Sequence, residues 1–382
     1  MHDQDDERGL WAGRALAYVV LALVALGIVV LASASTFRSQ TVYGDPFFFF
    51  KRQLIWLGLG ALALFFCARF NYHYWRKLAK YLAIFSTGLL ILVLFSPKIN
   101  GSHRWLHLGV MHFQPSELAK LAVVILLAHW IARGPWRMAA FKDGVLIPGL
   151  ALGMVLVLVL LEPDFGTTIM LAGVGWTMLF IGGTSKKWLL PVAAVGLALL
   201  LLFLRLDPIR WERILAWLWP KLHPKTAYQM MEAINAFILG GLDINWAGSI
   251  KKQGHLPEAH TDFIFAIAGE ELGLLGSLGI VGLFAAFLVC GLMICLHAPD
   301  LFGRYLAFGI TLLICFQAIL NMYVVTGLLP TKGITLPFFS YGGSSLFMTL
   351  TCCGILLNIG RYAENRRWYP LRERNAEGKS RK

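Results

Sequence analysis

Acidic residues at the edges of long apolar stretches are the first candidates for chemistry in this chain. Asp262 follows His260 and Thr261 and stands directly before an apolar run, in which Glu270 and Glu271 lie two turns farther along. A charge next to lipid is costly, so such a residue usually has a function or a partner. Partial removal from water would raise the pKa of Asp262 toward the range of a general base. A helix N-cap is the alternative role, because Asp is a favoured N-cap residue.

A second pair of carboxylates, Glu162 and Asp164, joins two apolar stretches with almost no loop between them. Pro163 breaks the first helix, and Asp164 together with Thr167 could cap the second. The other interpretation is a polar site at a membrane-embedded turn, where the two carboxylates hold a cation or a substrate hydroxyl. The sequence leaves both interpretations open.

Glu117 and Lys120 lie at the start of another apolar stretch. They are three residues apart, so they share one helix face and are expected to pair. Pro115 and Ser116 just before them are typical of a helix start, with Ser116 as the N-cap. Lys120 lies one turn inside the apolar run. A lysine that snorkels to the interface is the ordinary explanation, and a functional cation is the interpretation that we favour.

Further cations occur between the apolar stretches. Arg104 is followed by Trp105, Arg213 lies in a long intervening segment, and Lys332 precedes a glycine- and hydroxyl-rich stretch that includes Ser340. Such a stretch suits a re-entrant loop whose backbone approaches a ligand closely. Helix packing through small residues is the competing explanation.

Long apolar runs recur along the whole chain and must position these residues. Hydrophobic residues make up 58% of the 382 positions and charged residues only 14%, which is more apolar surface than one soluble core can bury. A span needs about 20 apolar residues, so the run at 263–296 is expected to be tilted or partly outside the membrane. The sequence therefore predicts an all-α, polytopic integral membrane protein with about ten transmembrane helices, near residues 14–35, 52–70, 78–96, 116–134, 144–162, 165–183, 187–206, 263–296, 304–328 and 340–361.

Lysine and arginine in the connecting loops predict the orientation, because cytoplasmic loops carry an excess of them. They place both termini in the cytoplasm, as an N-terminus at 1–13 and a basic tail at 362–382, within a single domain 1–382. The segment 207–262 then forms a large periplasmic loop between spans seven and eight, with a helix-like stretch at 227–239. The candidate residues above face the outer side of the membrane.

Two other kinds of site do not fit the sequence. The net charge of +13 comes from short loops and the C-terminal tail, without a basic stripe interleaved with aromatic residues, so we expect no nucleic-acid partner. The six cysteines all lie within apolar runs. We expect them to be buried small hydrophobic residues rather than disulfides or zinc ligands.

Taken together, these stretches resemble the SEDS family of membrane proteins, typified by FtsW, RodA and SpoVE. The resemblance covers nearly the whole chain. Two of its elements, LPEAHTDFIFA (256–266) and LPTKG (329–333), are more similar to the division protein FtsW than to the elongation protein RodA. The other elements are Arg104-Trp105-Leu106, QPSELAK (114–120), EPDFGTT (162–168), GEELG (269–273), Asn321 and SYGGSS (340–345).

This resemblance implies a peptidoglycan glycosyltransferase that polymerises lipid II at the outer leaflet of the bacterial inner membrane, at the division septum, and releases undecaprenyl diphosphate. It implies as partners membrane lipid, other division proteins and a class B penicillin-binding protein, an FtsI-like transpeptidase. Asp262 corresponds to the family's catalytic carboxylate. The resemblance specifies no cofactor and no metal ligand, although a divalent cation, Mg²⁺ or Mn²⁺, could help to neutralise the diphosphate. The residues expected to bind substrate are Arg104, Trp105, Glu117, Lys120, Asp164, Arg213, His260, Thr261, Lys332 and Ser340.

Three alternatives stay open at this point. A lipid II flippase fits the many spans and the intramembrane charge, although the charged motifs cluster at the outer ends of spans. A RodA-like elongation polymerase and a non-catalytic division scaffold are the others. The chain also departs from the family pattern after Tyr228-Gln229, at Glu232-Ala233 and in the turn 243–249, so substrate contacts from that region are not inferred.

Overall fold

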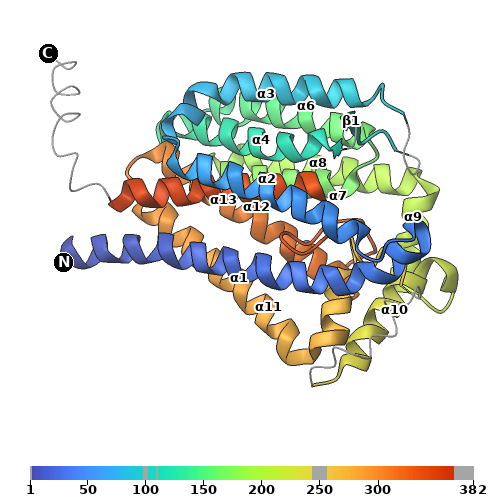
Figure 1. Cartoon of the computed structure of the whole chain (residues 1–382). Helices are drawn as coiled ribbons and strands as arrows, with labels where there is room; N and C mark the ends of the chain where they lie inside the picture. The colour runs from blue at the N-terminus through green and yellow to red at the C-terminus, as the bar shows by residue number, and fades with distance from the viewer. Residues whose placement is uncertain (1, 98–101, 109–110, 243–255, 365–382) are drawn as a thin grey trace, which may run out of the picture.

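The structure is a computed structural model and describes residues 2–97, 102–108, 111–242 and 256–364. Within these ranges the chain is a bundle of helices with one short β-hairpin (Figure 1). The elements are α1 (His2–Tyr43), α2 (Phe48–Arg69), α3 (His73–Val93), β1 (Leu106–Leu108), β2 (Met111–Phe113), α4 (Pro115–Ile131), α5 (Pro135–Met138), the π-helical turn η1 (Lys142–Leu146), α6 (Ile147–Leu161), α7 (Phe165–Ile181), α8 (Lys186–Leu206), α9 (Pro208–Leu218), α10 (Pro224–Gly240), α11 (Ile264–His297), α12 (Leu301–Val325) and α13 (Gly343–Glu364).

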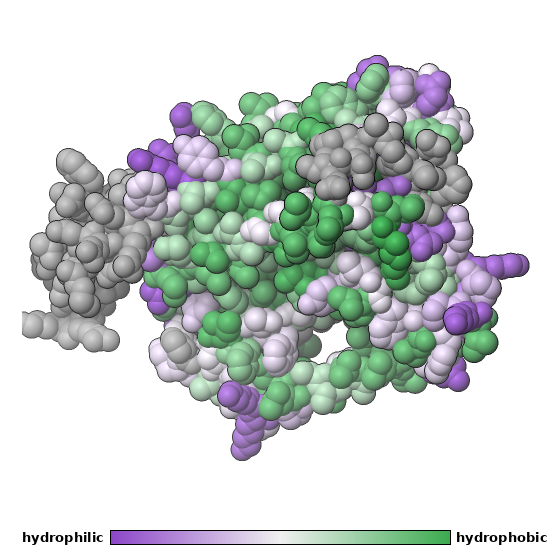
Figure 2. Space-filling model, turned by 90° about the horizontal axis from the view of Figure 1, so that it is seen from below, coloured by the Kyte–Doolittle hydropathy of each residue, from purple (hydrophilic) through white to green (hydrophobic). Residues whose placement is uncertain are grey.

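The helices expose apolar residues on their outer faces as well as burying them between one another. In the described part of the chain, seven helical stretches are long and apolar enough to cross a membrane. Figure 2 shows a broad hydrophobic surface across the middle of the molecule, with hydrophilic residues gathered toward its two ends. A surface of this kind requires lipid as its solvent. The prediction of an all-α, polytopic membrane protein is confirmed, with the addition of the small hairpin.

Each of the ten predicted spans overlaps a helix. Seven of them satisfy both length and composition: those in α1, α2, η1 with α6, α8, α11, α12 and α13. Helix α7 is apolar but shorter, α3 carries Arg76, Lys77 and Lys80, and α4 has only 17 residues. The count of ten therefore stays a prediction.

Helix α1 begins and α13 ends at the same end of the bundle, while the hairpin, α9 and α10 lie at the opposite end (Figure 1). This agrees with two termini on one side and the segment 207–262 on the other. The helix-like stretch at 227–239 is α10, and α9 was not predicted. The divergent turn 243–249 lies outside the described residues. Which end faces the cytoplasm is still inferred from the loop charges alone.

Helix α11 bends at Gly273, whose φ of 63° and ψ of −164° belong to a backbone region that essentially only glycine adopts. The bend separates a short arm, 264–272, from a long arm, 274–297. The Leu274 N–H donates to the Gly241 carbonyl (2.9 Å), and the Ser277 hydroxyl donates to the Gly273 carbonyl (2.9 Å). The predicted span at 263–296 is therefore long because it contains a kink.

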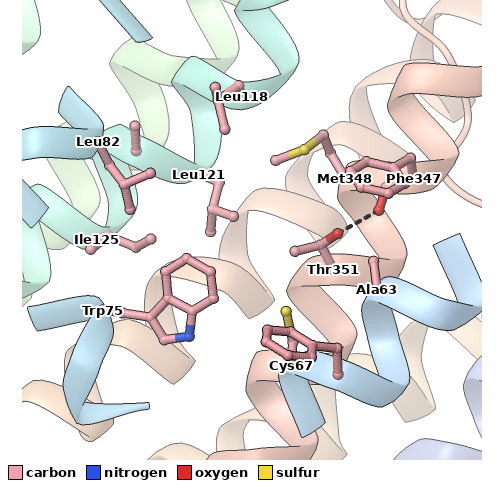
Figure 3. Close-up of a pocket in the computed structure, with 12 residues that line it drawn as sticks. Ala63, Cys67, Trp75, Leu82, Leu118, Leu121, Ile125, Phe347, Met348 and Thr351 are labelled. Carbon is pink, nitrogen blue, oxygen red and sulfur yellow. Dashed lines mark hydrogen bonds between the residues drawn. The ribbon is translucent and has the colours of Figure 1, made fainter. Parts of the chain in front are cut away.

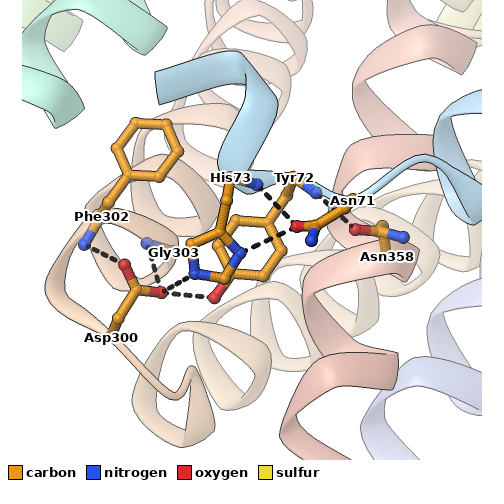
Figure 4. Close-up of polar contacts among 7 residues, drawn as sticks. All are labelled: Asn71, Tyr72, His73, Asp300, Phe302, Gly303 and Asn358. Atoms are coloured by element: carbon orange, nitrogen blue, oxygen red, sulfur yellow. Dashed lines mark hydrogen bonds and ion pairs between the residues drawn. The ribbon is translucent and has the colours of Figure 1, made fainter. Parts of the chain in front are cut away.

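A polar cluster joins three helices at the end of the bundle where α1 begins and α13 ends (Figures 1 and 4). Asp300 caps α12 by accepting from the Phe302 and Gly303 N–H groups (3.2 and 3.3 Å). It also accepts from the Tyr72 hydroxyl and lies 3.7 Å from His73 Nε2. On the other side, Asn358 of α13 accepts from the Tyr72 N–H (3.0 Å). These bonds connect the starts of α3 and α12 to α13.

All six cysteines are buried, as expected of small hydrophobic residues. The assignment of Ser116 as the N-cap of α4 is wrong, because the helix begins one residue earlier, at Pro115, with Gln114 in the N-cap position. The Ser116 hydroxyl is buried and has no hydrogen-bond partner in the described part of the chain.

Candidate active site

The β-hairpin holds the turn between α6 and α7 in place. Leu106 pairs with Phe113, so Arg104 and Gln114 leave the hairpin at its open end, with the half-buried Trp105 beside them. The Arg104 guanidinium donates to the carbonyls of Glu162 (3.0 Å) and Pro163 (2.5 Å), where a cation is favoured at the end of a helix. Sequence reasoning missed this hairpin, although alternating apolar and polar residues at 106–113 are its usual signal.

The two carboxylates of this turn have different roles. Asp164 caps α7: its Oδ1 accepts from the Thr167 N–H (3.2 Å), and its Oδ2 accepts from the Thr167 hydroxyl (3.0 Å) and the Gln114 amide (3.3 Å). The capping interpretation is confirmed. The Glu162 carboxyl is fully buried and makes no hydrogen bond within the described ranges. Burial above all, and then the charge of Asp164, raises its pKa to about 9, with Arg104 opposing.

Asp262 lies in the turn before α11, one residue ahead of the N-cap Phe263, so it does not cap that helix. It is half-buried, and no hydrogen bond or ion pair of its carboxylate is found among the described residues. Burial, followed by the charges of Glu258 and Asp164, raises its pKa to about 7, and Arg104 partly offsets this. The predicted direction of the pKa shift is confirmed, and the group titrates where a general base is most useful.

The backbone of Asp262 is fastened to the loop that joins α12 and α13. The Asn321 amide donates to the carbonyls of Asp262 (2.8 Å) and Ile334 (2.6 Å). A Cβ atom placed on Gly333 would lie 2.7 Å from Asp262 Oδ2, so this carboxylate rests against glycine backbone. The sequence offered Asn321 only as part of the resemblance, but a buried amide inside an apolar helix is itself a signal of function.

The loop between α12 and α13 reaches deep into the bundle. Phe338 packs against Phe284 and Phe287 of α11, with ring centres 6.3 and 6.1 Å apart. Its carbonyl oxygen lies against Gly27 of α1, where a Cβ atom would come within 2.4 Å. Irregular backbone at this depth is tolerated only where protein surrounds it. This geometry agrees with the expected re-entrant loop.

Lys332 and two arginines gather near the start of α7. The Lys332 ammonium lies 4.1 Å from the centre of the Phe165 ring. Burial and the charges of Arg210 and Arg213 lower its pKa to about 8, while Asp164 opposes that shift. Arg210, which was not predicted, pairs with its own helix cap Asp207 (3.2 Å). The resulting positive potential suits a polyanion such as a diphosphate.

Glu117 and Lys120 form a buried ion pair of 2.7 Å, with side-chain exposures of 8% and 5%. The predicted pairing is confirmed, and Lys120 does not snorkel to the interface. Its ammonium also donates to Gln317 Oε1 (3.0 Å), and the Gln317 amide donates to the Thr335 carbonyl (2.9 Å) and hydroxyl (3.0 Å). The ion pair thereby connects α4 through α12 to the re-entrant loop.

Three further predicted substrate contacts have partners within the protein. The buried ring of His260 packs against Phe49, with ring centres 4.6 Å apart, and burial lowers its pKa to about 4. The Ser340 hydroxyl accepts from the Leu336 N–H (2.7 Å), and the Thr261 hydroxyl donates to the Glu258 carbonyl (3.1 Å). These contacts shape the loops around Asp262. Their roles toward a substrate stay predictions.

An apolar cavity of about 260 Å³ lies between α2, α3, α4 and α13, and contains none of the predicted site residues (Figure 3). Its lining includes Cys67, Trp75, Leu121 and Met348. Because it contains no charged group, it is not the place where a proton or a phosphate would be handled.

The described ranges contain no group of three or more His, Cys, Asp or Glu side chains arranged to hold a metal ion. The oxygens of Asp164, the best-placed candidate, are already engaged by Thr167 and Gln114. This donor set does not fit a resident divalent cation. The involvement of Mg²⁺ or Mn²⁺ stays a prediction.

A family model for cell cycle proteins, covering FtsW, RodA and SpoVE, matches residues 14–365. The chain belongs to this family. A probable peptidoglycan glycosyltransferase FtsW from Geobacter metallireducens is 39% identical to it, over 89% of this chain and 92% of that protein. The stage V sporulation protein E of Bacillus subtilis is 38% identical, over 91% of this chain and 96% of that protein.

Solved structures of SEDS proteins share the fold. A chain from a peptidoglycan synthase complex, described for its coordination of polymerisation and crosslinking, matches with a TM-score of 0.76 and 32% identity over 91% of this chain and 97% of that chain. RodA of Thermus thermophilus matches with a TM-score of 0.68 and 30% identity over 91% of this chain and 95% of that chain. The expected family and helical membrane fold are therefore both confirmed.

Proposed function

We propose that this SEDS protein is a peptidoglycan glycosyltransferase that polymerises lipid II into glycan strands at the outer leaflet during cell division. Relatives that match most of the chain are named as peptidoglycan glycosyltransferases. The observation that carries the proposal is the half-buried carboxyl of Asp262, whose pKa is raised to about 7. It lies where the turn before α11 meets the re-entrant loop, within the field of Arg104 and Arg213.

Asp262 is the proposed general base. A hydroxyl of the acceptor sugar attacks the anomeric carbon of the donor, its proton passes to the Asp262 carboxylate, and the bond to the diphosphate oxygen breaks. A base with a pKa near the working pH is both ionised and basic enough for this transfer. Asn321 and Gly333 position the carboxylate, because one holds its backbone and the other leaves room for its Oδ2.

The leaving group departs as undecaprenyl diphosphate with the electron pair of the broken bond. Lys332 and Arg213 are the proposed groups that stabilise its charge, since the charge of Arg213 acts on Asp262 and on Lys332, and Lys332 interacts with Asp164. Fixed cations in a site with little water are effective at this task. Arg104 contributes charge as well, but two of its donors already hold the turn after α6.

The proposed partner is a class B penicillin-binding protein that crosslinks the new strands. A structural relative of this chain comes from a complex that coordinates polymerisation and crosslinking, which supports such a partner here. The FtsW protein of Geobacter metallireducens, at 39% identity, is more similar to this chain than the RodA of Thermus thermophilus, at 30%, so we propose the division septum as the place of action. Elongation remains the alternative role.

The pH dependence of polymerisation should be bell-shaped. Asp262 must lose its proton to act as a base, so kcat/KM is expected to rise with pH through an apparent pKa of about 7. Lys332 must keep its proton to face the diphosphate, so kcat/KM is expected to fall through about 8. Initial rates of glycan formation from labelled lipid II across pH 5 to 10 (a range of about five units) would measure both limbs.

The variant Lys332→Arg tests the upper limb separately. Arginine keeps its charge at every pH used here, so the fall above pH 8 (about the pKa of Lys332) should disappear while the lower limb stays in place. An unchanged upper limb would remove Lys332 from the mechanism. If kcat/KM instead rose through the ordinary carboxylate pKa, about 4, Asp262 would not be the general base.

The substitution Gly333→Ala should impair catalysis by moving Asp262. The new Cβ atom would lie 2.7 Å from Asp262 Oδ2, so the carboxylate must shift. We expect kcat to fall about 10- to 100-fold with little change in KM, because misplacing a reacting group costs rate more than binding. The matched control is Gly342→Ala, whose Cβ would make an ordinary contact of 3.6 Å. Equal kcat values for the two variants would contradict the role of Gly333.

A further inference from the structure

A second cavity, which is polar, lies between α9 and α10 at the end of the bundle opposite the start of α1. Its volume is about 380 Å³, within the range of pockets that hold small ligands. The residues that matter for its chemistry are Glu212, Arg213, Lys225, Thr226, Tyr228 and Gln229. Sequence reasoning selected only Arg213 among them.

The walls of this cavity are fixed to the rest of the site. The Trp217 indole N–H of α9 donates to the Gly327 carbonyl at the end of α12 (2.9 Å). On the other wall, Gly240 of α10 packs so closely on Gly269 of α11 that a Cβ atom would come within 2.0 Å of its carbonyl oxygen. The Thr226 hydroxyl donates to Glu212 Oε1 (2.8 Å) and joins the two helices directly. The pocket is therefore built into the fold.

The charge of the pocket favours an anion. Two cations, Arg213 and Lys225, line it against one carboxylate, Glu212, which already accepts from Thr226. Arg213 and Lys225 are both exposed and available to a ligand. Charge-assisted hydrogen bonds from such groups are among the stronger polar contacts.

The pocket is continuous with the candidate active site. Pro257 and Thr331 complete its lining, and they belong to the two segments that carry Asp262 and Lys332. The charge of Arg213 acts on both of those groups, since it lowers the pKa of each. A molecule in the pocket would therefore contact the two segments that carry the proposed base and Lys332. The exposed ring of Tyr228 offers a face against which a sugar can pack.

We propose that the α9–α10 pocket is a subsite for an anionic sugar of the lipid-linked substrate or of the growing strand. The inference rests on the proposed glycosyltransferase function and deepens it by assigning a binding role to Lys225. The shared chemistry is a negative group attached to a hexosamine. That group is either the diphosphate of the lipid carrier or a carboxylate of the peptide attached to the sugar.

A labelling experiment tests occupancy without any need for catalysis. The full chain in detergent is acetylated briefly, and modification of Lys225 and Lys221 is measured by mass spectrometry with inorganic pyrophosphate, with N-acetylmuramyl-L-alanyl-D-glutamate, or with neither. Lys221 is the matched control, because it is exposed in the same α9–α10 segment and does not line the pocket. We expect one probe to slow acetylation of Lys225 at least about threefold at saturation while Lys221 is unaffected.

The two probes separate the sources of the anion. Protection by pyrophosphate assigns the diphosphate, and protection by the muramyl peptide assigns the peptide carboxylate. Protection of neither lysine, or of both equally, would overturn the subsite. This readout is independent of the proposed function, because a chain that forms no polymer would still show it.

Kinetics of the charge reversal supply the second readout. Lys225→Glu should raise the KM for lipid II about tenfold with kcat nearly unchanged, since a cation that contacts substrate away from the reacting atoms contributes binding. Lys221→Glu should leave KM as in the unaltered chain. An unchanged KM in Lys225→Glu would overturn the inference even if polymerisation itself proceeds.

Discussion

The variant Asp262→Asn should stop polymerisation while making the protein more stable at alkaline pH. A general base typically contributes between about 10²- and 10⁴-fold to a rate, and the amide cannot accept the proton. The raised pKa means that the folded chain resists ionisation of Asp262, with a value of about 7 against an ordinary value of 3.8. The contribution of Asp262 to the unfolding free energy of the wild type therefore falls as pH rises from about 4 to 7. The variant has no ionisable group at this position and avoids that loss.

The expected gain in unfolding free energy is about 2–4 kcal/mol at pH 8 and close to zero at pH 4, with the half-burial of Asp262 keeping it below the full linkage value. Chemical unfolding in detergent at both pH values would measure it, beside initial rates from labelled lipid II. The exposed carboxylate of Glu212 supplies the control, because Glu212→Gln should give no such pH-dependent gain. A variant that loses activity and stability together would indicate a structural role for Asp262 instead.

Breaking the ion pair between Glu117 and Lys120 should have the largest effect on stability. Lys120→Met leaves the Glu117 carboxylate buried without its partner at 2.7 Å, and removing one member of such a pair costs about 3–5 kcal/mol. The link through Gln317 to Thr335 is lost as well. Because the re-entrant loop then loses a fixed contact, we expect polymerisation to fall about 100-fold.

The double variant Glu117→Gln with Lys120→Met separates stability from function. It removes both charges, so much of the lost stability should return, as it does when buried pairs are replaced by neutral residues. Activity should stay low because the bond to Gln317 is still missing. If the double variant were as active as the unaltered chain, the pair would serve folding alone. If Lys120→Met unfolded at the same denaturant concentration as wild type, the pair would not be buried in the native protein.

The helical membrane fold was predictable because it depends on hydrophobicity summed over long windows. A run such as 144–162 needs no knowledge of its neighbours to be recognised as a helix for lipid. The pairing of Glu117 with Lys120 was predictable for a similar reason, since a spacing of three residues on a helix fixes their separation. The pKa of Asp262 followed from its place before an apolar run.

Contacts between segments far apart in the chain could not be derived in this way. Nothing local in the sequence places Gly333 against Asp262, or Arg104 on the carbonyls of Glu162 and Pro163. These contacts depend on how α4, α7, α11 and α12 pack, and many packings satisfy the same hydrophobic pattern. The N-cap prediction for α4 was wrong for a local reason. Pro115 itself begins the helix, because proline is well tolerated at the first helical position.

The re-entrant loop and the kink at Gly273 could be predicted only in part. Glycine, proline and hydroxyl residues at 329–345 indicated irregular backbone, but its depth beside Phe284 and Phe287 depends on tertiary packing. The excess length of the run at 263–296 indicated a departure from a simple span. Only the structure showed that this departure is a bend at a glycine with positive φ.

The purified chain is incubated with labelled lipid II, with and without its cognate transpeptidase. We expect glycan polymer on a gel, formed with release of undecaprenyl diphosphate and absent in Asp262→Asn. The contradicting result would be no polymer under either condition while the same preparation moves lipid II across vesicle bilayers, because the chain would then be a flippase.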